Sequence, residues 1–267
     1  MTLKIAFIGG GNMATALVRG LAAQTPRPAL TVSEPDPAKH AAFQALGATT
    51  TTDNAAAVAG ADVIVLAIKP QVAPQVVPGL AGTWTSGKLL VSILAGAPTR
   101  KLEGWLPPGA RVVRAMPNTP LAIGVGMTGL VKGAHASDAD LATADSLFAP
   151  MGQVLRVSDE SRMDAITAVS GSGPAYFFRF AEALVDAAMA LGFTRDEAVL
   201  LVGQTGKGSW QYLLESGFQA TRLREQVTSP GGTTAAALAE LTKADFTGLW
   251  TTALKAAEAR GKELGKG

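Results

Sequence analysis

The chain has 267 residues, a formal net charge of +2 and no cysteine, and its two histidines, His40 and His135, are far apart. This composition excludes disulfides and cysteine–metal sites, and it argues against a histidine metal centre or a Ser-His-Asp triad. The mixed charges give no reason to expect nucleic acid or a membrane as partner, and no apolar run is long enough to span a bilayer. The first strand leaves no room for a signal peptide, so we expect a cytoplasmic protein.

The first strand and the turn after it contain the clearest local signal. The apolar residues 5–8 predict a strand buried on both faces, and a helical pattern begins at Asn12. Between them, Gly9-x-Gly11-x-x-Ala14 is typical of a dinucleotide-binding turn, in which the glycines permit the turn and the approach of a pyrophosphate. Amides at the helix start would hold the phosphate charge. The alternative is a glycine-rich turn that binds nothing.

Predicted strands and helices then alternate up to about Ser158. Strands are predicted at residues 30–33, 49–52, 61–68, 89–93, 111–115, 124–131 and 154–157, and helices at 37–46, 54–59, 71–80, 99–105 and 137–151. This alternation implies a Rossmann-type, doubly wound and mostly parallel sheet with helices on both faces. Ligands on such sheets bind where strands end, and Glu34, Lys69 and Ala95 all follow strand ends.

After Ser158 the strand patterns stop and Ala-rich helical periodicity takes over. Helices are predicted at 161–169, 174–191, 194–216, 221–227, 235–243 and 246–264, with a break at 170–173 and a loop at 228–234. Thr194 and Glu197 form a capping box, and Asp245 can cap the last helix. We therefore expect a dinucleotide-binding domain of residues 1–158 and an all-helical domain of residues 159–267.

Four groups of residues together resemble the pyrroline-5-carboxylate reductases over nearly the whole chain. They are residues 7–14, 67–70, 116–120, and the pair 170–176 with 227–234, and this last pair is the most specific. The resemblance implies transfer of a hydride from a nicotinamide cofactor to the C=N carbon of 1-pyrroline-5-carboxylate, which is the last step of proline biosynthesis. It also implies an interlocked homodimer, often within larger rings. In such a dimer each site combines the nucleotide domain of one subunit with helices of the other.

The expected cofactor contacts combine the glycine turn, the acid after the second strand and positions that match the family. They are Ile8, Gly9, Gly10, Gly11, Asn12, Met13, Ser33, Glu34, Asn54, Ala67, Ile68, Lys69, Pro70, Ala95 and Gln226. Without the resemblance, Lys69 is a solvated strand end, and Asn54 and Gln226 are ordinary polar residues. The rigid turn at residues 116–120 also follows a strand end, where it would border the nicotinamide.

Glu34 bears on the choice of cofactor. It follows Ala14 by 20 positions, about the spacing at which an acid meets the adenine ribose. A carboxylate there would accept hydrogen bonds from both ribose hydroxyls and repel a 2′-phosphate. Family members that favour NADPH tend to carry a small polar residue followed by arginine, whereas Pro35 follows here. We therefore expect NAD(P)H as cofactor with NADH preferred, although Ser33 could bond a phosphate and Glu34 could turn to solvent.

The substrate is expected at the loop before the helix predicted from residue 235. Ser229 lies in this loop, and the amides of Gly232, Thr233 and Thr234 can take a carboxylate. The family assigns hydrogen bonding of the substrate nitrogen to Thr234, our candidate catalytic residue, and it places Glu160 beside the substrate. Because a cyclic imine is readily protonated, no metal is required. Read alone, the loop could be a turn and a helix cap, and Glu160 a surface acid.

Two other functions compete with this one. A hydroxyacid dehydrogenase of the hydroxyisobutyrate type would need a lysine with an asparagine four residues later in the first helix of the second domain. Residues 174–191 contain neither lysine nor asparagine. A nucleotide-sensing protein without turnover would use residues 228–234 for packing alone. Oxidation of the cofactor in the presence of pyrroline-5-carboxylate separates the three.

Overall fold

The computed structural model describes residues 2–266. Within this range the strands form a single sheet in the order β3-β2-β1-β4-β5-β6-β7-β8. The strands are β1 (Lys4–Ile8), β2 (Ala29–Ser33), β3 (Thr49–Thr51), β4 (Val63–Leu66), β5 (Leu89–Ser92), β6 (Arg111–Pro117), β7 (Gly126–Lys132) and β8 (Gly152–Arg156). Neighbouring strands are parallel except β6 and β7, which are antiparallel. The predicted Rossmann-type sheet is confirmed.

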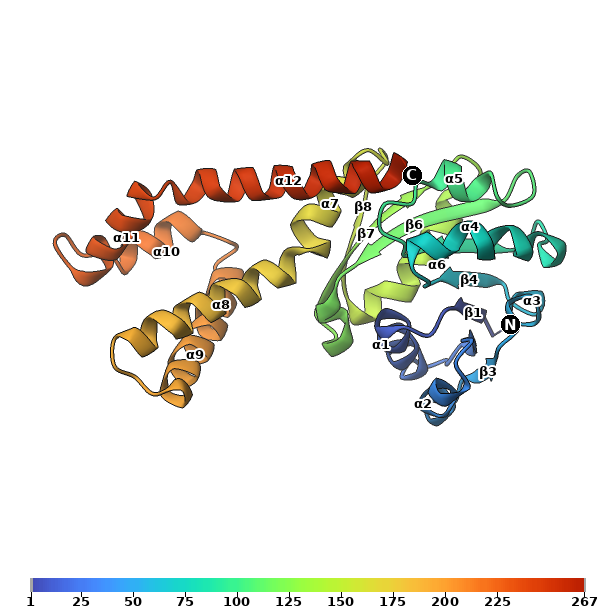
Figure 1. Ribbon diagram of the computed structural model, residues 1–267, viewed down its shortest axis with the longest axis horizontal. Helices are drawn as coiled ribbons and strands as arrows, with labels where there is room; N and C mark the ends of the chain where they lie inside the picture. Colours follow the sequence, from blue (N-terminus) through green and yellow to red (C-terminus); the bar gives the residue numbers. More distant parts are fainter. Residues whose placement is uncertain (1, 267) are drawn as a thin grey trace. The chain divides into compact units, whose positions relative to one another are not determined.

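Helices cover both faces of this sheet (Figure 1). The reason is that the central strands present apolar side chains on alternating sides. Phe7 and Val65 pack against α1 (Asn12–Ala22), α2 (His40–Ala45) and α6 (Asp138–Phe148). Ile8 and Leu66 pack against α3 (Asn54–Ala59), α4 (Ala73–Val76) and α5 (Thr99–Glu103). Both clusters are almost fully buried, so the central strands and the turns that follow them have rigid support.

One predicted helix of this region is wrong. Instead of a continuous helix over residues 71–80, the chain forms two 3₁₀ segments, η2 (Pro70–Val72) and η3 (Val77–Thr83), on either side of α4. Pro74 and Pro78 lack the amide hydrogens that a regular helix would use, and they break it into short turns. The remaining 3₁₀ segments are η1 (Pro37–Lys39), η4 (Thr119–Ile123) and η5 (Ala149–Met151).

The C-terminal region is helical, as expected, but two of its boundaries differ. It contains α7 (Arg162–Ile166), the π-helical turn η6 (Thr167–Gly171), α8 (Gly173–Ala190), α9 (Arg195–Glu215), α10 (Ala220–Gln226), α11 (Thr233–Lys243) and α12 (Phe246–Lys266). The predicted break at residues 170–173 is largely a π turn that leads into α8. Since α11 begins at Thr233, the predicted loop is shorter. The capping box is confirmed, because Glu197 accepts the Thr194 amide at 2.8 Å.

The chain separates into two compact units, which we call the sheet unit (Met1–Pro174 with Ala256–Gly267) and the helical unit (Ala175–Lys255). This division follows packing and differs from the one expected at residues 158 and 159. In the sheet unit, Met163 and Ile166 of α7 pack against Val131 and Val157 in a third apolar cluster. The first helix after the strands therefore belongs with the sheet.

Candidate active site

The glycine turn after β1 has the geometry that a dinucleotide needs. Gly9 has a φ of +100°, and a Cβ built on it would lie 2.7 Å from the carbonyl oxygen of Ala67, so only glycine fits. Gly11 has no heavy atom near such a Cβ, so the space in front of it is open. It is also the N-cap of α1 and offers no side chain to the first amides of that helix. These residues fit a pyrophosphate.

Glu34 lies directly against this turn. One oxygen, Oε2, accepts the amide hydrogen of Gly10 at 2.8 Å, and the other, Oε1, faces the amide of Asp36 at 3.2 Å and Lys39 Nζ at 3.3 Å. Burial raises the pKa of this carboxyl, but the bonds from Gly10, Asp36 and Lys39 outweigh it, so the pKa lies below its ordinary 4.5. Glu34 is 5% exposed, which excludes the alternative that it turns to solvent.

The other expected cofactor residues of the sheet unit gather at the same edge, because β1, β2, β4 and β5 are parallel and end together. Ser33 donates to Asn54 Oδ1 at 2.7 Å, which joins the end of β2 to the start of α3. The turn after β4 has Ala67 and Ile68 partly buried and Lys69 and Pro70 exposed, and Ala95, after β5, is partly buried. Gln226 belongs to the helical unit, at the end of α10.

In the helical unit, the start of α11 forms an open helix N-terminus. Gly231 adopts a φ of +70°, and Gly232 is an N-cap without a side chain. The amide of Gly232, expected to bind a carboxylate, donates instead to the carbonyl of Ser229 at 3.0 Å. The amides of Thr233 and Thr234 stand in the first turn, where a helix provides no acceptor. This arrangement can take an anion and presents two hydroxyls beside it.

Glu160, expected beside the substrate, has structural partners. It accepts the Thr99 amide at 2.8 Å and the Thr99 hydroxyl at 2.7 Å, and it faces Arg114 at 3.3 Å. Arg114 is 3% exposed and also pairs with Asp164 at 3.1 Å. Glu160 thus holds the start of α5, and its contact with substrate stays a prediction. The sequence did not lead us to predict roles for Thr99 and Arg114. The available signal for Arg114 was its charge within the otherwise apolar strand pattern of residues 112–115.

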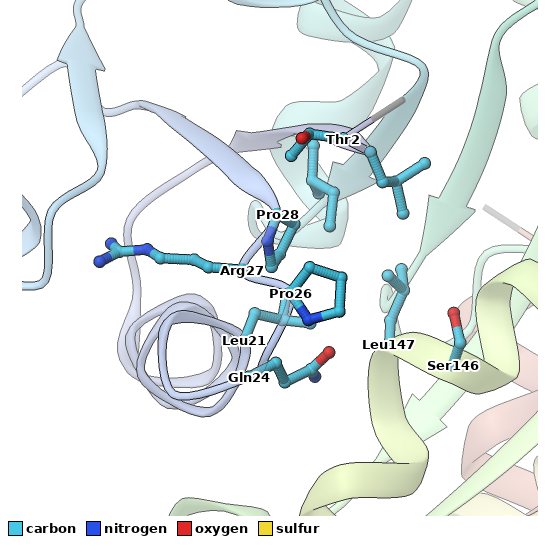
Figure 2. Close-up of a pocket in the computed structure, with 10 residues that line it drawn as sticks. Thr2, Leu21, Gln24, Pro26, Arg27, Pro28, Ser146 and Leu147 are labelled. Atoms are coloured by element: carbon cyan, nitrogen blue, oxygen red, sulfur yellow. The ribbon is translucent and has the colours of Figure 1, made fainter.

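A cavity of about 470 Å³ lies away from these residues. It is lined by Thr2 and Leu3 before β1 and by Gln24, Pro26 and Leu147, which Figure 2 shows in part. Because it sits at the amino end of β1, opposite the glycine turn, it is not the cofactor site. In the helical unit, Gln226 lines a separate hollow of about 290 Å³.

Within residues 2–266, no group of three or more His, Asp or Glu side chains could hold a metal ion. None of the helices described is long and apolar enough to cross a membrane.

Comparison with known proteins accounts for both units. Residues 4–96 match the family described as NADP oxidoreductase, coenzyme F420-dependent, and residues 160–264 match pyrroline-5-carboxylate reductase dimerisation. The chain is 43% identical over 265 residues to the pyrroline-5-carboxylate reductase of Pseudomonas aeruginosa, covering 98% of this chain and 97% of the relative. The solved structure of the Coxiella burnetii enzyme superposes with a TM-score of 0.91 at 40% identity over 99% of both chains. That of the Plasmodium falciparum enzyme with NADP bound gives 0.87 at 31% identity over 98% of both.

These matches span nearly the whole chain, and they join a nicotinamide dinucleotide domain to a dimerisation domain. The chain therefore binds a nicotinamide dinucleotide and forms homo-oligomers. The hydroxyacid dehydrogenase alternative is not favoured. The chain belongs to the pyrroline-5-carboxylate reductase family.

Proposed function

We propose that this protein reduces 1-pyrroline-5-carboxylate to proline with a reduced nicotinamide dinucleotide, as the last step of proline biosynthesis. The observation that carries the proposal is family membership over the full chain, with the glycine turn and the open end of α11 both present. The cofactor, when bound, supplies the hydride that reduces the C=N carbon. The chain then has to bind, orient and shield the two reactants, and it needs neither metal nor covalent catalysis.

The proposed cofactor residues lie mostly at the carboxyl ends of the parallel strands. The glycine turn and the first turn of α1 take the pyrophosphate, with Gly11 leaving room for it. Ser33, Glu34 and Asn54 are assigned to the adenine ribose, since they cluster after β2. The turns after β4 and β5, together with Gln226, complete the set, and the remaining members are Ile8, Gly10, Asn12, Met13, Ala67, Ile68, Lys69, Pro70 and Ala95.

The substrate is assigned to the start of α11. The amides of Thr233 and Thr234 lie at the N-terminus of α11, a helix of 11 residues, and can hold the carboxylate of the imine. The hydroxyl of Thr234 is a donor and an acceptor, so it can hydrogen-bond the imine nitrogen and hold it for protonation. Ser229 and Gly232 shape the turn that exposes these groups. Glu160 remains a proposed neighbour of the substrate, in addition to its contacts with Thr99 and Arg114.

We further propose that each active site is shared between two subunits. The cofactor residues lie almost entirely in the sheet unit and the substrate residues mostly in the helical unit. In the family such halves come from different chains of an interlocked dimer. A cytoplasmic location is part of the same proposal.

NADH is the proposed preferred cofactor. Glu34 presents a buried carboxylate of lowered pKa at the end of β2, so it is charged at neutral pH. A 2′-phosphate beside it would meet a like charge, and Lys39, the base nearby, already pairs with Glu34 at 3.3 Å. Two free ribose hydroxyls could instead donate to the lone pairs that remain on this carboxylate.

The experiment measures initial rates of NADH and NADPH oxidation with pyrroline-5-carboxylate as substrate. We expect cofactor oxidation with proline as product and a higher kcat/KM with NADH than with NADPH. In Glu34→Ser the difference in kcat/KM between the two cofactors should be smaller, because KM for NADPH should fall. Cofactor binding without turnover would refute the reductase function. A clear preference of the unmodified protein for NADPH would refute only the role of Glu34.

A further inference from the structure

Two side chains of β6 and that of the residue just after the strand form a row on one face of the sheet. Arg114, Met116 and Asn118 are each two positions apart, and the backbone at Asn118 is still extended (φ −121°, ψ 168°), so their side chains share a face. All three meet one stretch of chain, residues 160–171. These three alternate side chains therefore contact the helical segment that packs on this face.

The first two members of the row hold α7. Arg114 is buried and pairs with Glu160 at 3.3 Å and with Asp164 at 3.1 Å, so its charge is neutralised from two successive turns. Met116 packs against the cluster that contains Met163 and Ile166. Removing either contact would disturb α7 as a whole, which makes these two residues parts of the fold.

Asn118 differs, because its contacts are with the π turn. Its Nδ2 lies 3.2 Å from the carbonyl oxygen of Ser170 and 3.4 Å from the Ser170 hydroxyl, and its Oδ1 accepts the amide hydrogen of Met127 at 2.9 Å. A backbone amide can only donate and a carbonyl can only accept, so the carboxamide has one orientation that pairs both. Asn118 therefore bridges the start of β7 and the end of the π turn.

The sequence explains why Ser170 needs this partner. In an α-helical path its carbonyl would accept from the amide of residue 174, but residue 174 is proline and has no amide hydrogen. The backbone instead widens to a π turn, closed by a bond of 2.8 Å from the Ser172 amide to the Thr167 carbonyl. Asn118 supplies the donor that Pro174 lacks. Single π turns of this kind are frequent at functional sites.

We propose that Asn118 is a positioning residue for the reaction, which holds residues 170–173 at the cofactor edge so that they border the bound imine. β6 is parallel to β5, β4 and β1, so its carboxyl end lies on the same edge as the glycine turn. In this role Asn118 acts through Ser170, and the expected approach of residues 116–120 to the nicotinamide is a separate prediction. This inference rests on the proposed reductase function.

The test compares wild type, Asn118→Ala and the control Gln44→Ala in the full-length protein. Gln44 is an exposed amide on α2 whose Nε2 donates to the Thr50 hydroxyl at 2.8 Å, so the control removes a similar bond away from β6. We expect Asn118→Ala to raise KM for the imine about tenfold while Kd for NADH stays within about twofold. Amide exchange at Ser172 should accelerate in the same variant, and Gln44→Ala should resemble wild type.

An imine KM within about twofold of wild type in Asn118→Ala would overturn the proposal. So would a loss of apparent kcat with both KM values unchanged, since that is the signature of a smaller folded fraction. If Asn118→Ala is insoluble, Asn118→Asp keeps the acceptor for Met127 and replaces the donor to Ser170 with a carboxylate oxygen, and Ser172 exchange decides in the same way. A wild-type protein that oxidises no cofactor would instead refute the reductase function, which separates the two failures.

Discussion

The two compact units bury their side chains to very different degrees. The sheet unit contains three apolar clusters, with Phe7, Phe43 and Phe148 almost fully buried. In the helical unit, all of which the structure describes, Ala198 is the one buried residue. Many of its large apolar side chains are exposed, among them Phe178 at 62%, Leu200 at 71% and Leu249 at 60%.

This difference shows which part of the fold one chain can complete. The sheet unit has the core expected of an independent domain. Within the helical unit, aromatic rings form edge-to-face pairs, such as Phe177 with Trp210 at 5.1 Å and Tyr176 with Trp250 at 5.7 Å between ring centroids. An apolar surface this extensive marks an interaction site, and it agrees with the match to a dimerisation domain. We therefore expect a second chain to cover this surface.

The largest expected effect comes from a charge placed on this apolar surface. Phe178→Glu would bury a carboxylate without a partner, at a cost of several kcal/mol, so the dimer should dissociate and turnover should fall at least about a hundredfold. Light scattering and initial rates measure the two losses, and NADH titration should show that the sheet unit still binds cofactor.

Arg179→Gln, a polar exchange at the next position on α8, is the matched control and should leave the oligomer intact. A fully active monomer of Phe178→Glu would contradict this account of the helical unit, because the enzyme would then be active without a partner chain.

The next effect concerns the reaction in the helical unit. Thr234→Ala removes a hydrogen bond to the reacting group, so kcat/KM for the imine should fall roughly ten- to a hundredfold, or about 1.5–3 kcal/mol. Affinity for NADH should stay the same. The control is Thr242→Ala, since the Thr242 hydroxyl donates to the Leu238 carbonyl, at 2.8 Å, at the other end of α11. Lost NADH affinity with normal turnover at saturation would show that this end of α11 serves the cofactor.

The sequence could predict those elements that depend on neighbouring residues. Local signals were sufficient for β1, for α3 and for the capping box of Thr194, because apolar runs and caps act over a few residues. They failed over residues 71–80, where the effect of internal prolines was underweighted. The antiparallel pairing of β7 had no local signal.

The candidate site divides in the same way. The glycine turn was predictable from its own residues, and the start of α11 from the resemblance. The partners of Glu34, Glu160 and Asn118 were not, since Asn118 and Ser170 are 52 positions apart and Glu160 and Thr99 are 61 apart. Only the sheet brings such groups together, and a single sequence contains no direct record of those contacts.

A smaller effect is expected in the sheet unit from Gly9→Ala. The residue would need a φ of +100° and would meet the Ala67 carbonyl at 2.7 Å, so stability should fall by about 1–3 kcal/mol and NADH affinity should fall with it. Gly60→Ala is the control, because Gly60 has a helical backbone and open space around it. Thermal unfolding and NADH titration measure both. Equal melting temperatures for the two variants would contradict the account of this turn.

The smallest effect concerns pH. The folded-state pKa of Glu34 lies below 4.5, so the folded protein binds fewer protons here than the unfolded chain. The resulting stabilisation is present above the unfolded pKa and is lost as pH falls through the folded pKa. Thermal unfolding from neutral to acidic pH should therefore show a shallower decline in Glu34→Gln than in wild type. Parallel curves would mean that Glu34 does not contribute to acid sensitivity.

The proposal that two subunits build each site has a direct test in mixing two inactive variants. Gly11→Asp places a charge where the pyrophosphate would lie, and Thr234→Asp places one where the substrate carboxylate would bind, at a helix start that tolerates acids. After dissociation and random reassembly, half of the dimers are mixed and each contains one intact site. Activity should return to about a quarter of wild type. No recovery, with mixed dimers demonstrated by a tag on one variant, would show that each chain completes its own site and would contradict the account.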